Sequence, residues 1–383
     1  MKKKVLFFIE SLQCGGAEKS LISLLPILDY TRMDVELMLM KRRGIFEQYV
    51  PEHVQIFDFK QQVHPLLFLL FQTIFSLRLR WNRIIGRKEH DAETRWKTMH
   101  RAYTSMQKHY DVAIAYQQGF PTYYIADKVY ADTKIAWANV DLTKAGYCPQ
   151  FNTPFYNKYD KVIAVSANLQ KMLAEDGYAL LDKTTAVQDI LNVDLIRDMS
   201  TRSDFYKLPS DLTLVTVGRM VYQKGYDIAV EAADVLRHHG LNFHWYFVGD
   251  GTMRAAVEAH IRKRHLENHI TLLGEQANPY TFMKTADIYV QTSRFEGFGI
   301  TIAEAKILGK PVISTNFPVV HNQIVDGENG LIADMTPDAI AEKVILLARD
   351  AQLQEHIIHN INLERNNTAE VESAKVNTLI LSP

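Results

Sequence analysis

The sequence predicts an α/β fold made of two doubly wound domains, each a mostly parallel sheet with helices on both faces. Short apolar segments alternate with helical segments in the first half of the chain, and the same alternation starts again at residue 212. In addition, a chain of 383 residues is longer than one hydrophobic core usually supports. We therefore expect two domains of roughly 200 residues or fewer each.

In the first half, strands are expected wherever a short apolar run occurs, at residues 5–10, 35–40, 112–116, 134–138 and 161–166, with a helix over 17–28. Strands that alternate with helices in this way are typical of a parallel sheet. The apolar run over 5–9 follows three lysines and so imitates a signal peptide. It is too short for one, and no small-residue cleavage site follows it, so we interpret it as the first strand.

The second half repeats the pattern, with strands expected at residues 212–217, 243–248, 270–273 and 286–293, and helices at 227–239, 253–265 and 300–308. Between the two halves, polar and charged residues replace the periodic apolar pattern over residues 193–211. Domain boundaries fall in such segments. We therefore place the first domain over residues 1–200, the second over 201–365, and a C-terminal helical segment over 366–383.

The composition is typical of a globular protein with no overall attraction to nucleic acid, since 47% of residues are hydrophobic, 23% are charged and the formal net charge is -1. Cys14 and Cys148 show no disulfide spacing, so we expect free thiols in a reducing cytoplasm. There is no D-x-D motif, and histidines such as His260 and His265 lack the spacing of metal ligands. We therefore predict no metal.

One segment interrupts the alternation. Residues 66–77 are nearly all apolar, and they are followed by a basic stretch that contains Arg78, Arg80, Trp81, Arg83, Arg87 and Lys88. A bilayer span needs roughly 20 apolar residues, so this run is too short to cross a membrane. Two interpretations of residues 66–88 stay open: a buried helix with a solvated basic tail, or a basic amphipathic helix that lies at a membrane surface.

The most informative stretch is residues 296–304, in which Glu296 and Glu304 lie eight positions apart around Gly297 and Gly299. It follows a strand and opens a helix, and open α/β sheets bind ligands at the carboxyl ends of their strands. The glycines let a ligand approach the backbone, and the first N–H groups of the helix suit a diphosphate. Both carboxylates can accept hydrogen bonds from sugar hydroxyls. The stretch indicates a sugar-nucleotide site; the alternative is a turn residue and a solvated helix residue.

A second turn at the same sheet edge carries two cations. The strand over 212–217 leads into Gly218 and Arg219, and Lys224 precedes the next helix. Arginine offers a planar fork to phosphate oxygens and lysine a compact charge, so the pair suits stabilisation of a departing nucleotide diphosphate. Gly249 closes the following strand with a tight turn that would shape the pocket. The alternative is that Arg219 and Lys224 are ordinary surface cations.

The corresponding turn of the first half contains Gly15 and Gly16 but lacks the G-x-G-x-x-G spacing of dinucleotide-binding enzymes, which argues against a dehydrogenase. The two glycines would let this loop face the second domain closely. Asn139 and Asp141 follow the strand over 134–138, so we expect them to project into a cleft between the domains. Asp141 could assist an acceptor hydroxyl or could only form the turn.

Together these segments resemble glycosyltransferase family 4, retaining enzymes of the GT-B fold in which two Rossmann-like domains face a cleft. The resemblance covers most of the chain. It rests on Gly15-Gly16-Ala17-Glu18, on Gly218-Arg219 with Lys224-Gly225, and on the E-x7-E arrangement of Glu296 and Glu304. It implies that the donor binds the second domain and the acceptor the first. It also implies that the last helix, near residues 370–381, returns to the first domain.

The resemblance further implies a role for each matching residue. Arg219 and Lys224 would neutralise the diphosphate, and Glu304 would hold the ribose. Glu296, with the backbone of Phe298, Gly299 and Ile300, would hold the sugar and phosphate. One position departs from the family, because many relatives have a histidine where this chain has Asn139. Asparagine cannot take a proton at neutral pH, but a front-face displacement in which the departing phosphate receives the acceptor's proton does not need one.

The sequence thus predicts a metal-independent, cofactor-free cytoplasmic enzyme that moves a hexose or N-acetylhexosamine from a nucleotide-diphosphate sugar, expected to be a UDP-sugar, to a glycan with retention. The resemblance suggests a lipid-linked acceptor at the inner face of the cell membrane and a role in capsular or exopolysaccharide synthesis. No nucleic-acid partner is expected. Two alternatives stay open: a catalytically silent partner subunit that binds sugar nucleotide, suggested by Asn139, and a GT-B epimerase that acts on a sugar nucleotide.

Overall fold

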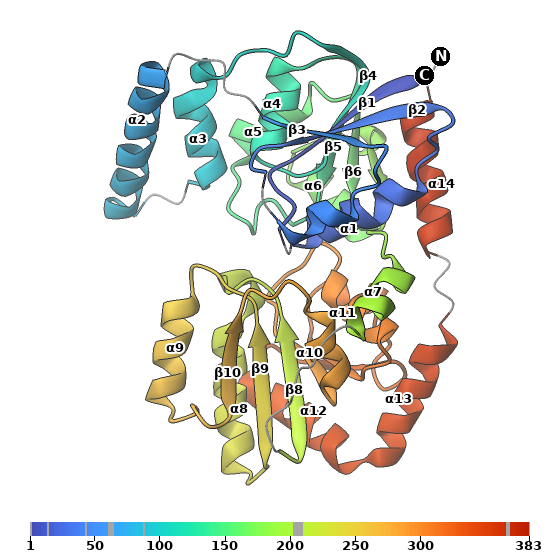
Figure 1. Cartoon of the computed structure of the whole chain (residues 1–383). Coiled ribbons are helices and arrows are strands. Elements are labelled where there is room, and N and C mark those ends of the chain that lie inside the picture. The colour runs from blue at the N-terminus through green and yellow to red at the C-terminus, as the bar shows by residue number, and fades with distance from the viewer. Residues whose placement is uncertain are drawn as a thin grey trace. The chain divides into compact units, whose positions relative to one another are not determined.

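A computed structural model of the chain describes residues 2–13, 15–42, 44–59, 65–86, 89–201, 210–364 and 368–382. Cys14, Arg87, Lys88 and residues 202–209 of the expected boundary segment therefore lie outside the described residues. The chain forms two units, Met1–Ile190 with Thr368–Pro383, and Leu191–Asn367 (Figure 1). Each unit is built on its own sheet, and every strand pairing is parallel. The predicted α/β class is confirmed.

The sheet of the first unit has seven strands in the order β3-β2-β1-β4-β5-β6-β7. Their bounds are β1 Lys3–Ile9, β2 Met33–Leu39, β3 Gln55–Asp58, β4 His109–Ala115, β5 Tyr130–Ala138, β6 Lys161–Ala164 and β7 Thr184–Ala186. The central strand β1 is apolar on both faces, and its residues from Val5 to Ile9 have no solvent exposure. Such two-sided burial is typical of parallel strands that helices cover on both sides.

The helices of the first unit are α1 Gly16–Leu24, α2 Pro65–Ile84, α3 Asp91–Met99, α4 Phe120–Lys128, α5 Pro149–Tyr156, α6 Ala167–Glu175 and α14 Thr368–Leu381. The helix expected over 17–28 ends early, at Leu24, and continues as the 3-10 turn Leu25–Ile27. Pro26 explains this difference, because proline has no N–H group to donate and its ring clashes with the preceding turn of an α-helix. α6 begins where the sequence predicts a strand end, because the Ser166 hydroxyl accepts a hydrogen bond from the Leu169 N–H.

The C-terminal helix α14 belongs to the first unit. Its Glu372 carboxylate accepts a hydrogen bond from the Gln188 N–H at 3.0 Å, and its Asn377 side chain accepts one from the Asp29 N–H at 3.0 Å. Val376 is fully buried. The last segment of the chain therefore completes the unit that the first segment begins, as the red helix in Figure 1 shows.

The second unit has a six-stranded sheet in the order β10-β9-β8-β11-β12-β13. The strands are β8 Leu212–Val217, β9 Phe243–Val248, β10 Ile270–Gly274, β11 Ile288–Gln291, β12 Val312–Thr315 and β13 Leu331–Ala333. The helices are α7 Val193–Ser200, α8 Tyr226–His238, α9 Arg254–Lys263, α10 Tyr280–Thr285, α11 Ile300–Ile307, α12 Pro337–Arg349 and α13 Ala351–Leu363. The strand order reverses between β8 and β11, which is where doubly wound sheets bind ligands.

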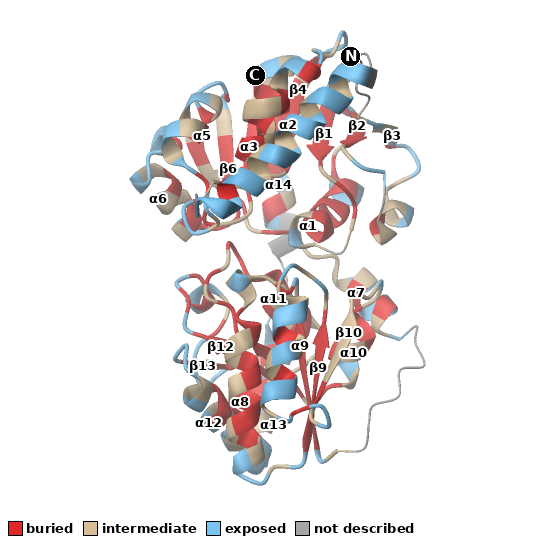
Figure 2. Ribbon diagram, turned by 90° about the vertical axis from the view of Figure 1, so that its left-hand side faces the viewer, coloured by how far each residue is buried: buried red, intermediate tan, exposed pale blue. Residues whose placement is uncertain are grey.

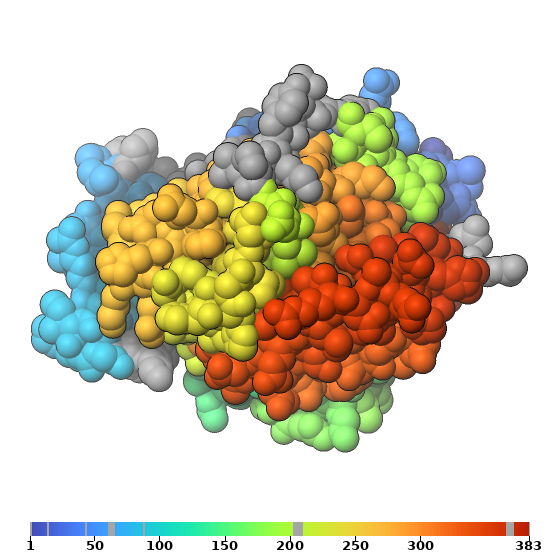
Figure 3. Space-filling model, turned by 90° about the horizontal axis from the view of Figure 1, so that it is seen from below, coloured from blue at the N-terminus to red at the C-terminus, as the bar shows by residue number. Residues whose placement is uncertain are grey.

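Two large aromatic side chains, Trp245 and Phe247, lie at the centre of this unit's core, and Figure 2 shows strand β9 buried along its length. On the outer face, α8, α12 and α13 lie side by side, as the yellow and orange-red helices of Figure 3 show. α12 also contacts β12 and β13 of the sheet, whereas α13 contacts α11 as well as α12.

Candidate functional site

The candidate site lies at the carboxyl ends of β8 and β11. After β8, the chain turns through Gly218 and Arg219, forms the 3-10 turn Tyr222–Lys224 and enters α8 at Gly225. Gly225 has a φ of +63°, and a Cβ atom there would lie only 2.0 Å from the carbonyl oxygen of Thr292. Only glycine fits so close to this carbonyl oxygen. The turn that contains Lys224 therefore packs directly against the end of β11.

The Glu296 carboxylate is the centre of a dense hydrogen-bond network. Its Oε1 accepts hydrogen bonds from Lys224 Nζ at 2.6 Å, Ser293 Oγ at 2.6 Å and Gln291 Nε2 at 2.8 Å. Its Oε2 accepts one from Gln223 Nε2 at 3.1 Å. The side chain of Glu296 is only 8% exposed. Glu296 is thus a fixed, nearly buried anion paired with a cation, which is more than a simple turn residue requires.

Four residues that sequence reasoning missed hold this network in place. Gln291 donates to Ser293 Oγ at 2.7 Å, and its own Oε1 accepts hydrogen bonds from the Tyr289 hydroxyl and from Thr301 Oγ1. Burial raises the pKa of the Tyr289 phenol well above its ordinary value, so this hydroxyl keeps its proton to donate. The available signal was the run of polar residues, 291–293, at the end of an apolar strand.

Arg219 is exposed, and within the described residues its guanidinium forms no hydrogen bond or ion pair. The backbone beside Arg219 is closely packed at two glycines, Gly218 and Gly249. A Cβ atom at Gly249, where φ is +141°, would lie 2.0 Å from the Gly218 carbonyl oxygen, and one at Gly218 would lie 3.3 Å from Lys224 Cε. The two turns and the lysine stem therefore pack tightly. This arrangement leaves the arginine free to bind an anion beside the Lys224–Glu296 pair.

Glu304 lies in the second turn of α11 and is fully buried, so it is not a solvated helix residue. Its Oε1 accepts a hydrogen bond from the hydroxyl of Tyr280 at 2.7 Å, which joins α11 to α10. At the start of α11, Gly299 has a φ of +90°, and no side chain caps the helix. The N–H groups of its first turn can therefore bind an anionic group.

Hydrogen bonds from the Gln323 side chain hold the loop that leads into α11. The Gln323 side-chain amide donates to the carbonyl oxygens of Phe298 and, at 3.4 Å, of Gly299. Phe298 and Ile300 are both 8% exposed. The segment from Gly297 to Ile300 is therefore an ordered loop, and Gln323 is a further supporting residue that no sequence motif indicated.

The remaining predicted residues belong to the first unit. Gly15 precedes α1, and a Cβ atom there would lie 2.2 Å from the Glu18 carboxylate; Gly16 is the first residue of that helix. Asn139 donates from its side chain to the Tyr116 carbonyl oxygen at 3.0 Å. Asp141 accepts a hydrogen bond from the Lys144 N–H at 3.0 Å, an arrangement that stabilises a turn.

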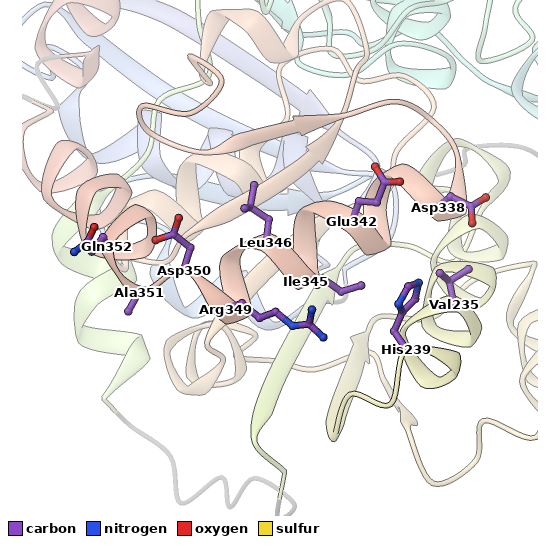
Figure 4. Close-up of a pocket in the computed structure, with 10 residues that line it drawn as sticks. All are labelled: Val235, His239, Asp338, Glu342, Ile345, Leu346, Arg349, Asp350, Ala351 and Gln352. Carbon is purple, nitrogen blue, oxygen red and sulfur yellow. The ribbon is translucent and has the colours of Figure 1, made fainter.

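Metal ligands do not gather in the described part of the chain: among those residues, no three His, Cys, Asp or Glu side chains form a group that could hold an ion. A hollow of about 780 Å³ occurs elsewhere in the second unit, lined by residues from the end of α8, from α12 and from the start of α13 (Figure 4). It includes Val235 and His239 at the C-terminal end of α8, whereas Lys224 precedes the N-terminal end of that helix. The 13-residue helix is about 20 Å long, so the hollow is separate from the candidate site.

Comparison with known proteins agrees with this geometry. Residues 201–363 match the family described as Glycosyl transferases group 1. An uncharacterized glycosyltransferase of Methanocaldococcus jannaschii is 28% identical over 52% of this chain and 53% of its own length. The capsular polysaccharide biosynthesis glycosyltransferase CapM of Staphylococcus aureus is 29% identical over 41% of this chain and 42% of its own. The chain thus spans about half the length, or less, of these curated relatives.

Solved structures resemble the whole chain. Anabaena HepE in complex with UDP-glucose has a TM-score of 0.71 at 20% identity and covers 99% of this chain and 98% of its own. TarM has a TM-score of 0.69 at 13% identity and covers 100% of this chain and 99% of its own. At these identities the likeness shows the fold. The chain therefore has the GT-B fold, and residues 201–363, which lie in its second unit, match the group 1 glycosyltransferase family.

Proposed function

We propose that this protein transfers a hexose or N-acetylhexosamine from a UDP-sugar to a glycan, with retention of configuration at the anomeric carbon. The observation that carries the proposal is the Lys224–Glu296 ion pair beside the unpaired Arg219. All three residues lie within the segment that matches the group 1 glycosyltransferase family. The HepE structures with UDP and UDP-glucose support the choice of a uridine donor.

In this proposal, Arg219 and Lys224 supply the positive charge that the departing diphosphate needs, so that neither a metal nor a cofactor is required. The acceptor oxygen attacks the anomeric carbon on the face from which the diphosphate leaves. The bond between that carbon and the phosphate oxygen breaks, its electron pair goes to UDP, and the phosphate oxygen takes the acceptor's proton. Cations fixed in advance beside the leaving group stabilise this charge most strongly in the transition state.

Glu296 is proposed to hold the sugar. A carboxylate has about four acceptor positions, and the protein already donates three hydrogen bonds to Oε1 but only one to Oε2. Oε2 therefore keeps capacity for a sugar hydroxyl. Glu304 is proposed to hold the ribose, and the backbone from Gly297 to Ile300, with the start of α11, to contact the phosphates.

The first unit is proposed to bind the acceptor. Asn139 occupies the position where a histidine could act as a base; its amide group already donates to Tyr116, and an amide cannot take a proton at neutral pH. This supports a mechanism in which the phosphate itself is the base. The likeness to CapM supports a role in capsular or exopolysaccharide synthesis. A lipid-linked glycan acceptor, with the enzyme in the cytoplasm at the inner face of the membrane, is part of the same proposal.

The test is a donor panel. The purified chain is incubated with UDP-glucose, UDP-galactose, UDP-N-acetylglucosamine or GDP-mannose, with and without bacterial membrane lipid extract, and nucleotide release is followed beside the Glu304→Ala variant. The proposal predicts release from one UDP-sugar that needs both the lipid extract and Glu304. Binding of a donor with no release would favour the silent partner subunit, and conversion of the donor sugar without release would favour the epimerase.

A further inference from the structure

Helix α2 has two apolar faces, and only one of them is covered. The inner face packs on α3: the Phe75 ring lies 5.3 Å from the guanidinium carbon of Arg95, and Asn82 donates to Glu89 at 2.9 Å and to Thr94 at 3.4 Å. Figure 1 shows α2 beside α3, and the 3-10 turn His100–Ala102 also contacts α2. The expectation of a buried helix over this segment is therefore wrong for the outer half of α2.

The outer face of α2 is a continuous apolar stripe. Its members are spaced alternately by three and four residues and are each between 43% and 77% exposed: Leu67, Leu70, Ile74, Leu77, Trp81 and Ile84. Residues at this spacing lie along one side of a helix. Because α2 has 20 residues, the stripe extends over about 30 Å. The pale blue surface of α2 in Figure 2 shows this exposure.

The charges around the stripe have one sign. Arg80 and Arg83 are exposed and form no ion pair within the described residues, and Arg78 lies 3.8 Å from Glu89. Residues 65–86 contain no aspartate or glutamate. A large apolar surface bordered by arginines, on a helix that has no acidic residue of its own, is unusual on a chain whose formal net charge is only -1.

We propose that the outer face of α2 docks on an anionic lipid bilayer, with the apolar stripe at the boundary of headgroups and acyl chains and with Arg80 and Arg83 against lipid phosphates. Helices of this kind combine an apolar face with basic residues and lie in the plane of the membrane surface. No helix in the described part of the chain is long and apolar enough to cross a bilayer. This inference deepens the membrane-surface location given in the proposed function, but it concerns vesicle binding alone, so it can fail while the transfer activity is retained.

A second copy of the chain is the competing occupant, because spacing by three and four residues is also that of a coiled-coil seam. In such a seam the positions beside the apolar residues normally carry opposite charges. Here Arg78 and Arg80 flank the stripe on its two sides, and no acid accompanies them on α2. Pairing two such helices would bring arginines together, whereas anionic phosphates complement them.

The experiment is cosedimentation of the full chain with vesicles of phosphatidylcholine alone or mixed with phosphatidylglycerol. Binding to the anionic vesicles is expected to weaken as salt is added. The Arg80→Gln/Arg83→Gln variant should bind about 30-fold more weakly, and Leu70→Gln/Leu77→Gln about 100-fold more weakly. These side chains are exposed, so folding should not change, and the thermal midpoint of each variant checks this.

Two matched control variants test whether binding depends on α2 or on any exposed leucine or arginine of the chain. Leu180→Gln/Leu181→Gln alters equally exposed leucines elsewhere in the first unit, and Arg32→Gln/Arg262→Gln removes two exposed arginines. Both controls should bind as the wild type does. The proposal is overturned if the wild type stays in the supernatant with anionic vesicles, or if the controls and the α2 variants bind alike. It is also overturned if sedimentation velocity shows a dimer that Leu70→Gln/Leu77→Gln dissociates while vesicle binding is absent.

Discussion

Replacing Lys224 by alanine should separate the structural role of its ammonium group from its role in catalysis. The substitution removes a 2.6 Å ion pair and leaves Glu296, with a side chain only 8% exposed, as an uncompensated charge. Breaking a buried pair in this way typically costs about 3–5 kcal/mol. Three neutral donors, from Gln223, Gln291 and Ser293, stay on the carboxylate. We therefore expect a loss of about 3 kcal/mol, the lower end of that range.

For a unit of this size, a loss of that order corresponds to a fall of about 6–12 °C in the thermal midpoint. The rate of nucleotide release at saturating donor should fall by about 100- to 1000-fold, because the leaving diphosphate loses a cation. The double variant Lys224→Ala/Glu296→Gln removes the stranded charge as well. It should therefore regain most of the lost midpoint while its rate of release stays low.

The assay is scanning calorimetry and nucleotide release on the same preparations of the full chain. Lys343→Ala is the matched control, because Lys343 forms an exposed ion pair with Asp326 at 3.8 Å in the same unit. Its loss should cost less than about 1 kcal/mol and leave the rate unchanged. Near-normal release by folded Lys224→Ala, or recovery of both rate and midpoint in the double variant, would refute a catalytic role for Lys224.

Three further predictions follow from particular contacts. Glu304→Gln should weaken UDP binding by about 10- to 100-fold in titration calorimetry, because a charged acceptor is lost. Gly225→Ala should lower the thermal midpoint far more than Gly327→Ala, since both have positive φ but only the first would place a Cβ atom against a backbone oxygen. Burial raises the pKa of Asp189 to about 7, from an ordinary 3.8, so between these values the folded chain holds a proton that the unfolded chain lacks. The free energy of unfolding should therefore fall by up to about 4 kcal/mol as the pH rises through this window, and Asp189→Asn should remove that part of the pH dependence.

Each of these has a contradicting outcome. Unchanged UDP affinity in Glu304→Gln would remove this residue from the site. Equal midpoints for the two glycine variants would mean that the turn before α8 relaxes without cost. A pH dependence of unfolding that is the same in Asp189→Asn as in the wild type would show that this carboxyl does not titrate in the window.

Much of the fold could be predicted because central parallel strands are buried on both faces and so appear as uninterrupted apolar runs. The strands around β1 and β8 were found in this way. Four strands were missed: β3, β7, β12 and β13. β3, β7 and β13 are short strands at a sheet edge, and Gln55 and Asp58 in β3 are exposed. β12 is buried but has only four residues. Such strands are held by their neighbours and carry little signal of their own.

The site could be predicted in part for a similar reason. Carboxyl ends of parallel strands lie at one edge of a sheet, so Lys224 after β8 and Glu296 after β11 were expected at the same edge. In the structure the two strands are adjacent, and the two side chains lie 2.6 Å apart. The supporting residues Gln291 and Ser293 could not be found, because their role depends on which side chains face one another across the strand end. The hydrogen bond from Tyr280 to Glu304 joins residues 24 positions apart and has no local pattern.

The central claim is that the second unit binds a nucleotide diphosphate through the cations beside Glu296. The most direct test is titration calorimetry of UDP into the wild-type chain, Arg219→Ala and the control Arg237→Ala, whose arginine pairs with Asp234 on α8. The account predicts that the wild type and Arg237→Ala bind UDP equally and that Arg219→Ala binds it about 10- to 100-fold more weakly. Equal affinity in all three proteins, or no binding by the wild type, would contradict it.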